Sequence, residues 1–125
     1  MADDIKKVVI LGSTGSIGVS ALKVAKDLSE RIEVVGIAAH RSADKLLSQL
    51  NETGARAACL SDQDVAESIR NKIPSGVDML SGQDGLVELA TLEEADIVLI
   101  AIVGVAGLKP ALAALEAGKD LAVAS

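Results

Sequence analysis

The chain has 125 residues, of which 50% are hydrophobic and 24% are charged, and its formal net charge is −6. This length suits one domain, and the apolar content excludes a disordered chain. Nucleic acid and membranes are not expected as partners, because the chain lacks a net positive charge, aromatic rings that could stack on bases, and any apolar stretch of about 18 residues.

Segments typical of strands and of helices alternate along the chain. Aliphatic and β-branched runs predict strands at residues 6–11, 32–39, 57–60, 77–80, 96–103 and 121–124. Apolar residues at helical spacing, bounded by polar caps, Gly or Pro, predict helices at residues 16–28, 43–53, 63–73, 82–90 and 108–117. This alternation is typical of parallel βαβ units. The sequence therefore predicts an α/β fold, a Rossmann-like doubly wound and mostly parallel sheet with helices on both faces.

The single cysteine, Cys59, lies in the third predicted strand among apolar neighbours. One cysteine cannot form an intrachain disulfide, and the pattern predicts a packing role rather than a reactive thiol. A lone cysteine is consistent with a reducing compartment such as the cytoplasm.

A glycine-rich loop joins the first predicted strand to the first predicted helix. Its spacing, G-x-x-G-x-x-G, is a relative of the dinucleotide fingerprint G-x-G-x-x-G. In such a loop Gly12 permits a sharp turn, Gly15 lets a diphosphate approach the backbone, and Gly18 lets the helix lie close to the sheet. The residues predicted to bind a dinucleotide here are Gly12, Ser13, Thr14, Gly15, Ser16, Ile17 and Gly18. The alternative is a tight strand-to-helix turn that binds nothing.

The polar groups of this loop suit an anion. N–H groups at the start of a helix lack intrahelical acceptors and lie at the positive end of the helix dipole, so we expect unpaired N–H groups from Thr14 to Ile17. The hydroxyl groups of Ser13, Thr14 and Ser16 can add donors. No Gly-Lys-Ser/Thr sequence follows the loop, which argues against a phosphoryl-transfer P-loop.

The end of the second predicted strand bears on the choice between NAD and NADP. NAD-selective sites place an acidic residue there for the ribose 2′-OH. This chain instead has His40, Arg41 and Ser42, and Asp44 lies inside the next helix. Because Arg41 can pair with a 2′-phosphate and its neighbours can donate hydrogen bonds, we predict NADP(H) as the cofactor. The alternative is that Arg41 is a solvated surface charge and that His40 is structural or merely exposed.

The fifth predicted strand should lie beside the first, so its carboxyl end should border the same cofactor crevice. Its last residues, Ala101, Ile102 and Val103, are small or apolar, which suits contact with a ribose and a nicotinamide. Ser125, at the end of the last predicted strand, should face the same crevice. The alternative is a simple strand exit followed by a flexible glycine loop at residues 104–107.

Four segments of the chain together resemble one protein family. They are Val9–Gly18, Leu80–Gly82, Ala101–Pro110 and Ala117–Lys119. In their order and spacing they are similar to 1-deoxy-D-xylulose 5-phosphate reductoisomerase, and the resemblance covers essentially the whole chain. The combination is specific, whereas the glycine loop alone would not be.

The resemblance implies an NADPH-dependent oxidoreductase and isomerase of the non-mevalonate isoprenoid pathway, in the bacterial cytoplasm. The full-length enzyme rearranges 1-deoxy-D-xylulose 5-phosphate and reduces the aldehyde intermediate to 2-C-methyl-D-erythritol 4-phosphate, with Mg or Mn as its metal, and it is usually a homodimer. The family's Lys-Glu pair, metal carboxylates and substrate phosphate site would follow Ser125. We therefore expect residues 1–125 to be an NADPH-binding domain, incomplete at its C-terminus, with the catalytic and C-terminal domains absent and no activity alone.

The resemblance also implies roles for single residues. Thr14 to Ile17 would hold the cofactor phosphates. The adenosine end would meet His40, Arg41 and Ser42, where family members commonly have Gly-Lys-Asn or Gly-Arg-Asn. Ser125 stands where the family commonly has the Asn of Ala-Asn-Lys-Glu, which makes it a candidate cofactor contact with a changed side chain.

Two other functions remain open at this point. One is a stand-alone, non-catalytic dinucleotide-binding regulatory module. The other is a different oxidoreductase, such as a semialdehyde dehydrogenase, which would need a catalytic Cys and His; Cys59 is a poor candidate for that Cys. We predict no catalytic and no metal-binding residue in this chain. The acidic residues before the fifth predicted strand are expected to be helix-end and surface charges: Glu93, Glu94 and Asp96.

Overall fold

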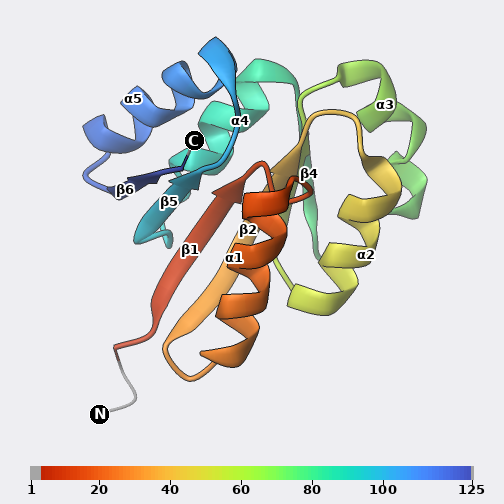
Figure 1. Ribbon diagram of the computed structural model, residues 1–125. Coiled ribbons are helices and arrows are strands. Elements are labelled where there is room, and N and C mark those ends of the chain that lie inside the picture. Colours follow the sequence, from red (N-terminus) through yellow and green to blue (C-terminus); the bar gives the residue numbers. More distant parts are fainter. Residues whose placement is uncertain (1–3, 125) are drawn as a thin grey trace.

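The strands form one parallel sheet in the computed structural model, which describes residues 4–124 (Figure 1). They are β1 (Lys6–Leu11), β2 (Ile32–Ala39), β3 (Ala57–Leu60), β4 (Asp78–Ser81), β5 (Ile97–Ile100) and β6 (Asp120–Val123). Their order across the sheet is β4-β3-β2-β1-β5-β6, and every adjacent pair is parallel. The chain moves outward from β1 to β4 and then returns to the other side of β1. The predicted doubly wound, Rossmann-like fold is therefore confirmed.

Helices cover both faces of this sheet. They are α1 (Ser16–Asp27), α2 (Ala43–Thr53), α3 (Gln63–Ser68), α4 (Gly82–Ala90) and α5 (Leu108–Glu116), with 3-10 turns η1 (Arg70–Lys72) and η2 (Gly104–Gly107). One apolar core lies between the sheet and α1, α2 and α3, and the second lies between the sheet and α4 and α5. Central strands are buried on both faces because each alternates its side chains between the two cores, as Val9 and Ile10 do.

Two elements are shorter than the sequence predicts. The third helix ends at Ser68, and a 3-10 turn follows it. Pro74 requires the residue before it to be extended, and Ile73 has φ −74° and ψ 133°, so the α-helix cannot continue to that point. Strand β5 ends at Ile100, because its partner β1 ends opposite it at Leu11. Residues 104–107, predicted as a loop, form η2.

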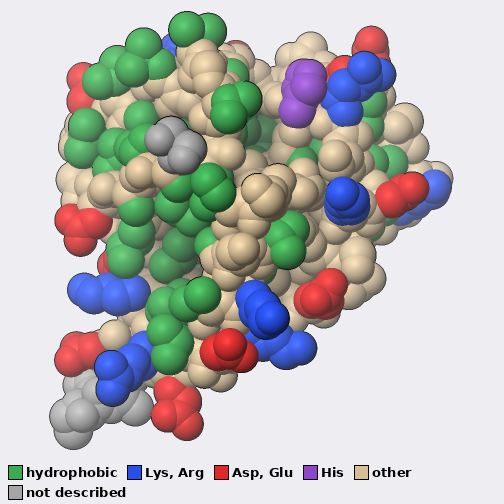
Figure 2. Space-filling model, in the orientation of Figure 1, with side chains coloured by type: hydrophobic (Ala, Val, Ile, Leu, Met, Phe, Trp, Pro, Cys, Tyr) green, Lys and Arg blue, Asp and Glu red, His purple; other side chains and the backbone are tan. Residues whose placement is uncertain are grey.

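Some large apolar side chains lie outside both cores. Figure 2 shows hydrophobic side chains gathered over β5, β6 and α5, on the left of the view. On α5 the exposed apolar residues are leucines, whereas Pro110 and Ala114 are buried against the sheet. Among residues 4–124, no helix has the length and apolar character that crossing a membrane requires.

Candidate nucleotide-binding site

Three of the predicted segments meet at one edge of the sheet. β1 lies between β2 and β5, and the strands are parallel, so the residues that follow each of them lie at the same edge. The N–H groups of Gly12 and Ser13 both donate to the carbonyl oxygen of Ala38 on β2, at 2.8 and 2.9 Å. On the other side, Ala101 N–H donates to Leu11 at 2.8 Å. The glycine loop therefore sits at the point where the strand order reverses, which is where open α/β sheets bind their ligands.

Two of the loop's three glycines are required by the fold itself. Gly12 has φ +96°, and a β-carbon on it would lie 2.6 Å from the carbonyl oxygen of Ala101. A β-carbon on Gly18 would collide with the carbonyl oxygen of Gly12. These two glycines therefore allow the loop to turn against β5 and allow α1 to lie against the loop. They support the site without themselves being open to a ligand, since Gly18 is buried and Gly12 is half-buried.

Neither the backbone conformation nor the packing of the loop requires glycine at position 15. Its φ of −78° and ψ of 173° suit any residue. It is exposed, and the nearest protein atom to a β-carbon built on it is the Gly12 oxygen at 3.7 Å. The missing side chain therefore leaves the backbone open on the outer side of the loop, which is the approach that a diphosphate needs.

Some of the N–H groups at the start of α1 are free to bind an anion. Among residues 4–124 the N–H groups of Thr14, Ser16 and Ile17 have no acceptor, and they lie at the positive end of a 12-residue helix. The expectation that Gly15 also has an unpaired N–H is wrong: it donates to the Gly12 carbonyl at 3.3 Å, because the loop closes a tight turn there. Three of the four predicted N–H groups thus remain for an anion.

The expected role of the Ser13 hydroxyl as a ligand donor is also wrong. Ser13 is fully buried, and its hydroxyl donates to Oε1 of Gln49 at 2.7 Å. Gln49 reaches the loop from α2, and its Nε2 donates to the Ser13 carbonyl at 2.9 Å. We did not predict Gln49, although a signal was present, because it is a polar residue on the helix face that carries the buried Leu46 and Leu50.

The residues after β2 form two polar pairs with the segment after β3. Nδ1 of His40 lies 2.7 Å from Oγ of Ser61, and Nε of Arg41 lies 3.2 Å from Oδ2 of Asp62. The Arg41 side chain is 69% exposed, and among residues 4–124 its terminal nitrogen atoms have no acceptor. Asp62 also caps α3 by accepting from the N–H of Val65. Arg41 is thus oriented by the Asp62 carboxylate, a pairing that the sequence did not predict, and its outer edge still faces solvent.

The other predicted contacts have different environments. Ser42 occupies the N-cap position of α2, but its side chain makes no capping hydrogen bond. Ala101 and Ile102 are half-buried beside the loop, whereas Val103 is 87% exposed. Ser125 lies outside the described residues. Among residues 4–124 no group of three His, Cys, Asp or Glu side chains could hold a metal ion.

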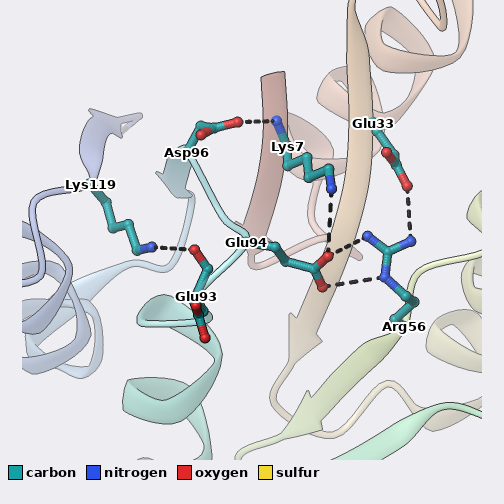
Figure 3. Close-up of polar contacts among 7 residues, drawn as sticks. All are labelled: Lys7, Glu33, Arg56, Glu93, Glu94, Asp96 and Lys119. Atoms are coloured by element: carbon teal, nitrogen blue, oxygen red, sulfur yellow. Dashed lines mark hydrogen bonds and ion pairs between the residues drawn. The ribbon is translucent and has the colours of Figure 1, made fainter. Parts of the chain in front are cut away.

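The acidic residues before β5 lie at the opposite edge of the sheet, where the strands begin (Figure 3). Glu94 pairs with Arg56 at 2.5 Å and with Lys7 at 3.8 Å, and Arg56 also pairs with Glu33 at 3.0 Å. The hydrogen bonds from Arg56 lower the pKa of Glu94. Asp96 accepts from the backbone N–H of Lys7 at 2.8 Å. These residues connect the beginnings of four strands and lie at the opposite edge from the glycine loop.

Cys59 is fully buried in β3, and burial raises the pKa of its thiol to about 12. The predicted packing role is therefore confirmed. A thiol that stays protonated at neutral pH is not the nucleophile that a semialdehyde dehydrogenase requires.

Comparison with known proteins identifies the family. The sequence profile of 1-deoxy-D-xylulose 5-phosphate reductoisomerase matches residues 8–125. The chain belongs to this family. The reductoisomerase of Anaeromyxobacter sp. (strain K) is 46% identical over 120 residues, which is 96% of this chain and 31% of that protein.

Solved reductoisomerases share the fold. The enzyme from Zymomonas mobilis in complex with NADPH superposes with a TM-score of 0.83 at 36% identity, over 97% of this chain and 32% of that one. A reductoisomerase in complex with NADPH, fosmidomycin and magnesium gives a TM-score of 0.84 at 34% identity, over 94% of this chain and 29% of that one. The chain thus spans about a third of the length of the reductoisomerases that it matches.

Proposed function

We propose that residues 1–125 form the NADPH-binding domain of a 1-deoxy-D-xylulose 5-phosphate reductoisomerase. The observation that carries this proposal is Gly15, whose side-chain position is empty and open beside three unpaired N–H groups. Helix N-termini with free N–H groups are ready-made sites for phosphate. The complexes of related reductoisomerases with NADPH support the same choice of ligand.

The residues at this edge of the sheet would contact different parts of the cofactor. Thr14, Ser16 and Ile17 would donate backbone N–H groups to the diphosphate, while Gly12, Ser13 and Gly18 would shape the loop from within. Arg41, held by Asp62, would pair with the 2′-phosphate. The residues that border the adenosine and nicotinamide ends would be His40, Ser42, Ala101, Ile102, Val103 and Ser125.

NADPH, when bound, supplies the hydride for a reduction. The complete protein would rearrange 1-deoxy-D-xylulose 5-phosphate and reduce the product to 2-C-methyl-D-erythritol 4-phosphate, as a homodimer that uses Mg or Mn. We assign the metal, the sugar phosphate and the catalytic groups to the two thirds of the family's length that this chain does not match. A lone cysteine and bacterial relatives support the bacterial cytoplasm as its location.

Calorimetric titration with NADPH and with NADH tests the proposal. We expect the chain to prefer NADPH, and we expect Arg41→Ala to lose most of that preference, because a charge-assisted guanidinium–phosphate contact is worth about tenfold in affinity. Lys45→Ala, an exposed cation on α2, is the control and should leave the preference intact. Binding of neither nucleotide would overturn the proposal, and an unchanged preference in Arg41→Ala would overturn the role of Arg41.

A further inference from the structure

Ser13 and Gln49 are the two polar side chains that are buried among residues 4–124, and they bind each other. Oε1 of Gln49 accepts from the Ser13 hydroxyl at 2.7 Å, and Nε2 of Gln49 donates to the Ser13 carbonyl at 2.9 Å. Because a carbonyl can only accept, this orientation of the carboxamide is the one that satisfies both bonds. The N–H of Ser13 donates in turn to Ala38 on β2. All polar groups of Ser13 are therefore held from the protein side of the loop.

This arrangement fixes a neighbouring group that faces the other way. The carbonyl of Ser13 and the N–H of Thr14 belong to one planar peptide unit, and no peptide bond among the described residues is cis. In a trans peptide these two groups point in opposite directions. When Gln49 holds the carbonyl inward, the N–H of Thr14 must point outward, and it is one of the loop's N–H groups that have no acceptor among the described residues.

We propose that Gln49 is a positioning residue that sets the direction of the Thr14 N–H toward the cofactor diphosphate. This inference rests on the proposed NADPH-binding function. Without the Gln49 amide, the Ser13 carbonyl would be buried with no donor, and rotation of the peptide would bring it to the surface to find water. The same rotation would replace an N–H donor by a carbonyl oxygen at the anion site, which repels a diphosphate.

A role in packing alone would not need a carboxamide at this position. Gln49 lies on the apolar face of α2 beside Leu46 and Leu50, and an aliphatic side chain there would leave the buried Ser13 carbonyl without its donor. A buried polar group is unfavourable unless its hydrogen bonds are satisfied. Only the bond from Nε2 to the Ser13 carbonyl controls the peptide, so that bond should matter more for ligand affinity than the bond from the Ser13 hydroxyl.

Calorimetric titration with NADPH separates these two bonds. Gln49→Met removes both and keeps the side-chain length, and Gln49→Glu keeps an acceptor for the hydroxyl but loses the donor. Both should bind NADPH about tenfold more weakly than the wild type, the size expected for one well-made hydrogen bond. Ser13→Ala keeps the Nε2 bond and should lose less than about threefold in affinity. Leu50→Val, a core variant of the same helix, should leave the affinity unchanged although it lowers stability.

The NMR chemical shift of the Thr14 amide proton reports on ligand contact, and a change in stability alone would not alter its response to NADPH. In the wild type its NMR resonance should shift strongly on addition of NADPH, and in Gln49→Met and Gln49→Glu the shift should be lost. The role of Gln49 would be overturned if folded Gln49→Met bound NADPH as tightly as the wild type or lost no more affinity than Leu50→Val. It would also be overturned if the Thr14 resonance of Gln49→Met still shifted on addition of NADPH. These outcomes would leave the proposed NADPH-binding function standing. If Gln49→Met does not fold, the comparison of Gln49→Glu with Ser13→Ala replaces it. Gln49→Glu should then lose about tenfold in NADPH affinity together with the Thr14 shift, and Ser13→Ala should lose less than about threefold. A wild-type chain that does not bind NADPH would overturn both this role and the proposed function.

Discussion

At the scale of single residues, substitution of Gly15 should weaken ligand binding while leaving the stability of the fold nearly unchanged. A methyl group in Gly15→Ala meets no protein atom closer than 3.7 Å, and the backbone conformation suits alanine. We expect a stability loss below about 1 kcal/mol, mainly from a poorer N-cap, and at least about tenfold weaker NADPH binding, because the methyl group occupies the diphosphate's approach. Urea unfolding and calorimetry measure the two quantities.

Gly18→Ala is the matched control for that experiment. Its β-carbon would collide with the Gly12 carbonyl oxygen, so this variant should lose stability itself. Wild-type NADPH affinity in a folded Gly15→Ala chain would show that the ligand does not approach the loop at this point.

Cys59 offers a second test at this scale. Because burial raises the pKa of its thiol to about 12, almost none is thiolate at pH 8, and the side chain is inaccessible. We expect no reaction of the folded chain with a thiol reagent such as Ellman's reagent over an hour at pH 8, and complete reaction in concentrated urea. Stoichiometric labelling of the folded chain would contradict the buried position of β3.

At the scale of elements, α5 shows which side of a helix faces the core. The helical spacing of Leu108, Leu112 and Leu115 is regular, yet all three are more than half exposed, while Ala114 is fully buried. We therefore expect Leu112→Gln to change the free energy of unfolding by less than about 1 kcal/mol. Ala114→Gln should cost about 2 kcal/mol or more, because it forces a larger polar side chain into the packed interface with the sheet.

Urea unfolding of both α5 variants measures this difference. The reverse ranking would mean that the leucine face, rather than the alanine face, packs against the sheet. The exposed leucines, together with the apolar side chains over β5 and β6 (Figure 2), also form a surface of the kind that promotes association.

At the scale of the whole molecule, the ion pairs of Arg56 join the beginnings of β2, β3 and β5 (Figure 3). The pKa of Glu94 is lowered in the folded chain, chiefly by hydrogen bonds from Arg56. A lowered folded-state pKa contributes stability that is present above the unfolded value of about 4.3 and is lost as pH falls through the folded value. The contribution of Glu94 should therefore be complete at pH 7 and vanish in strong acid.

Thermal unfolding of Glu94→Gln between pH 7 and pH 3 tests this expectation. Both partners are about a third or more exposed, so the loss at pH 7 should stay within about 1 kcal/mol, and the difference from the wild type should shrink as pH falls. Glu67→Gln, which removes a local pair with Arg70 within one helical turn, is the control and should have a smaller effect. A difference that grows toward pH 3 would contradict the assigned direction of the pKa shift.

Much of the architecture follows from local pattern alone. The strands at 6–11, 32–39 and 57–60 have the bounds that their aliphatic runs predict. The glycine loop sits between a strand and a helix as its spacing predicts. These features depend on periodicity and on backbone preferences of neighbouring residues, so the sequence by itself determined the fold class, the position of the loop and the resemblance to the reductoisomerases.

Only the tertiary structure decided which polar groups the loop presents. Ser13 turns inward because Gln49, 36 positions away, meets it, and Arg41 is oriented by Asp62 from the end of the next strand. The burial of Ala114 rather than of the leucines on α5 likewise depends on which face of the helix packs against the sheet. Such choices are made by contacts between segments remote in sequence, where hydrogen-bond satisfaction and close packing outweigh the preference of any single residue.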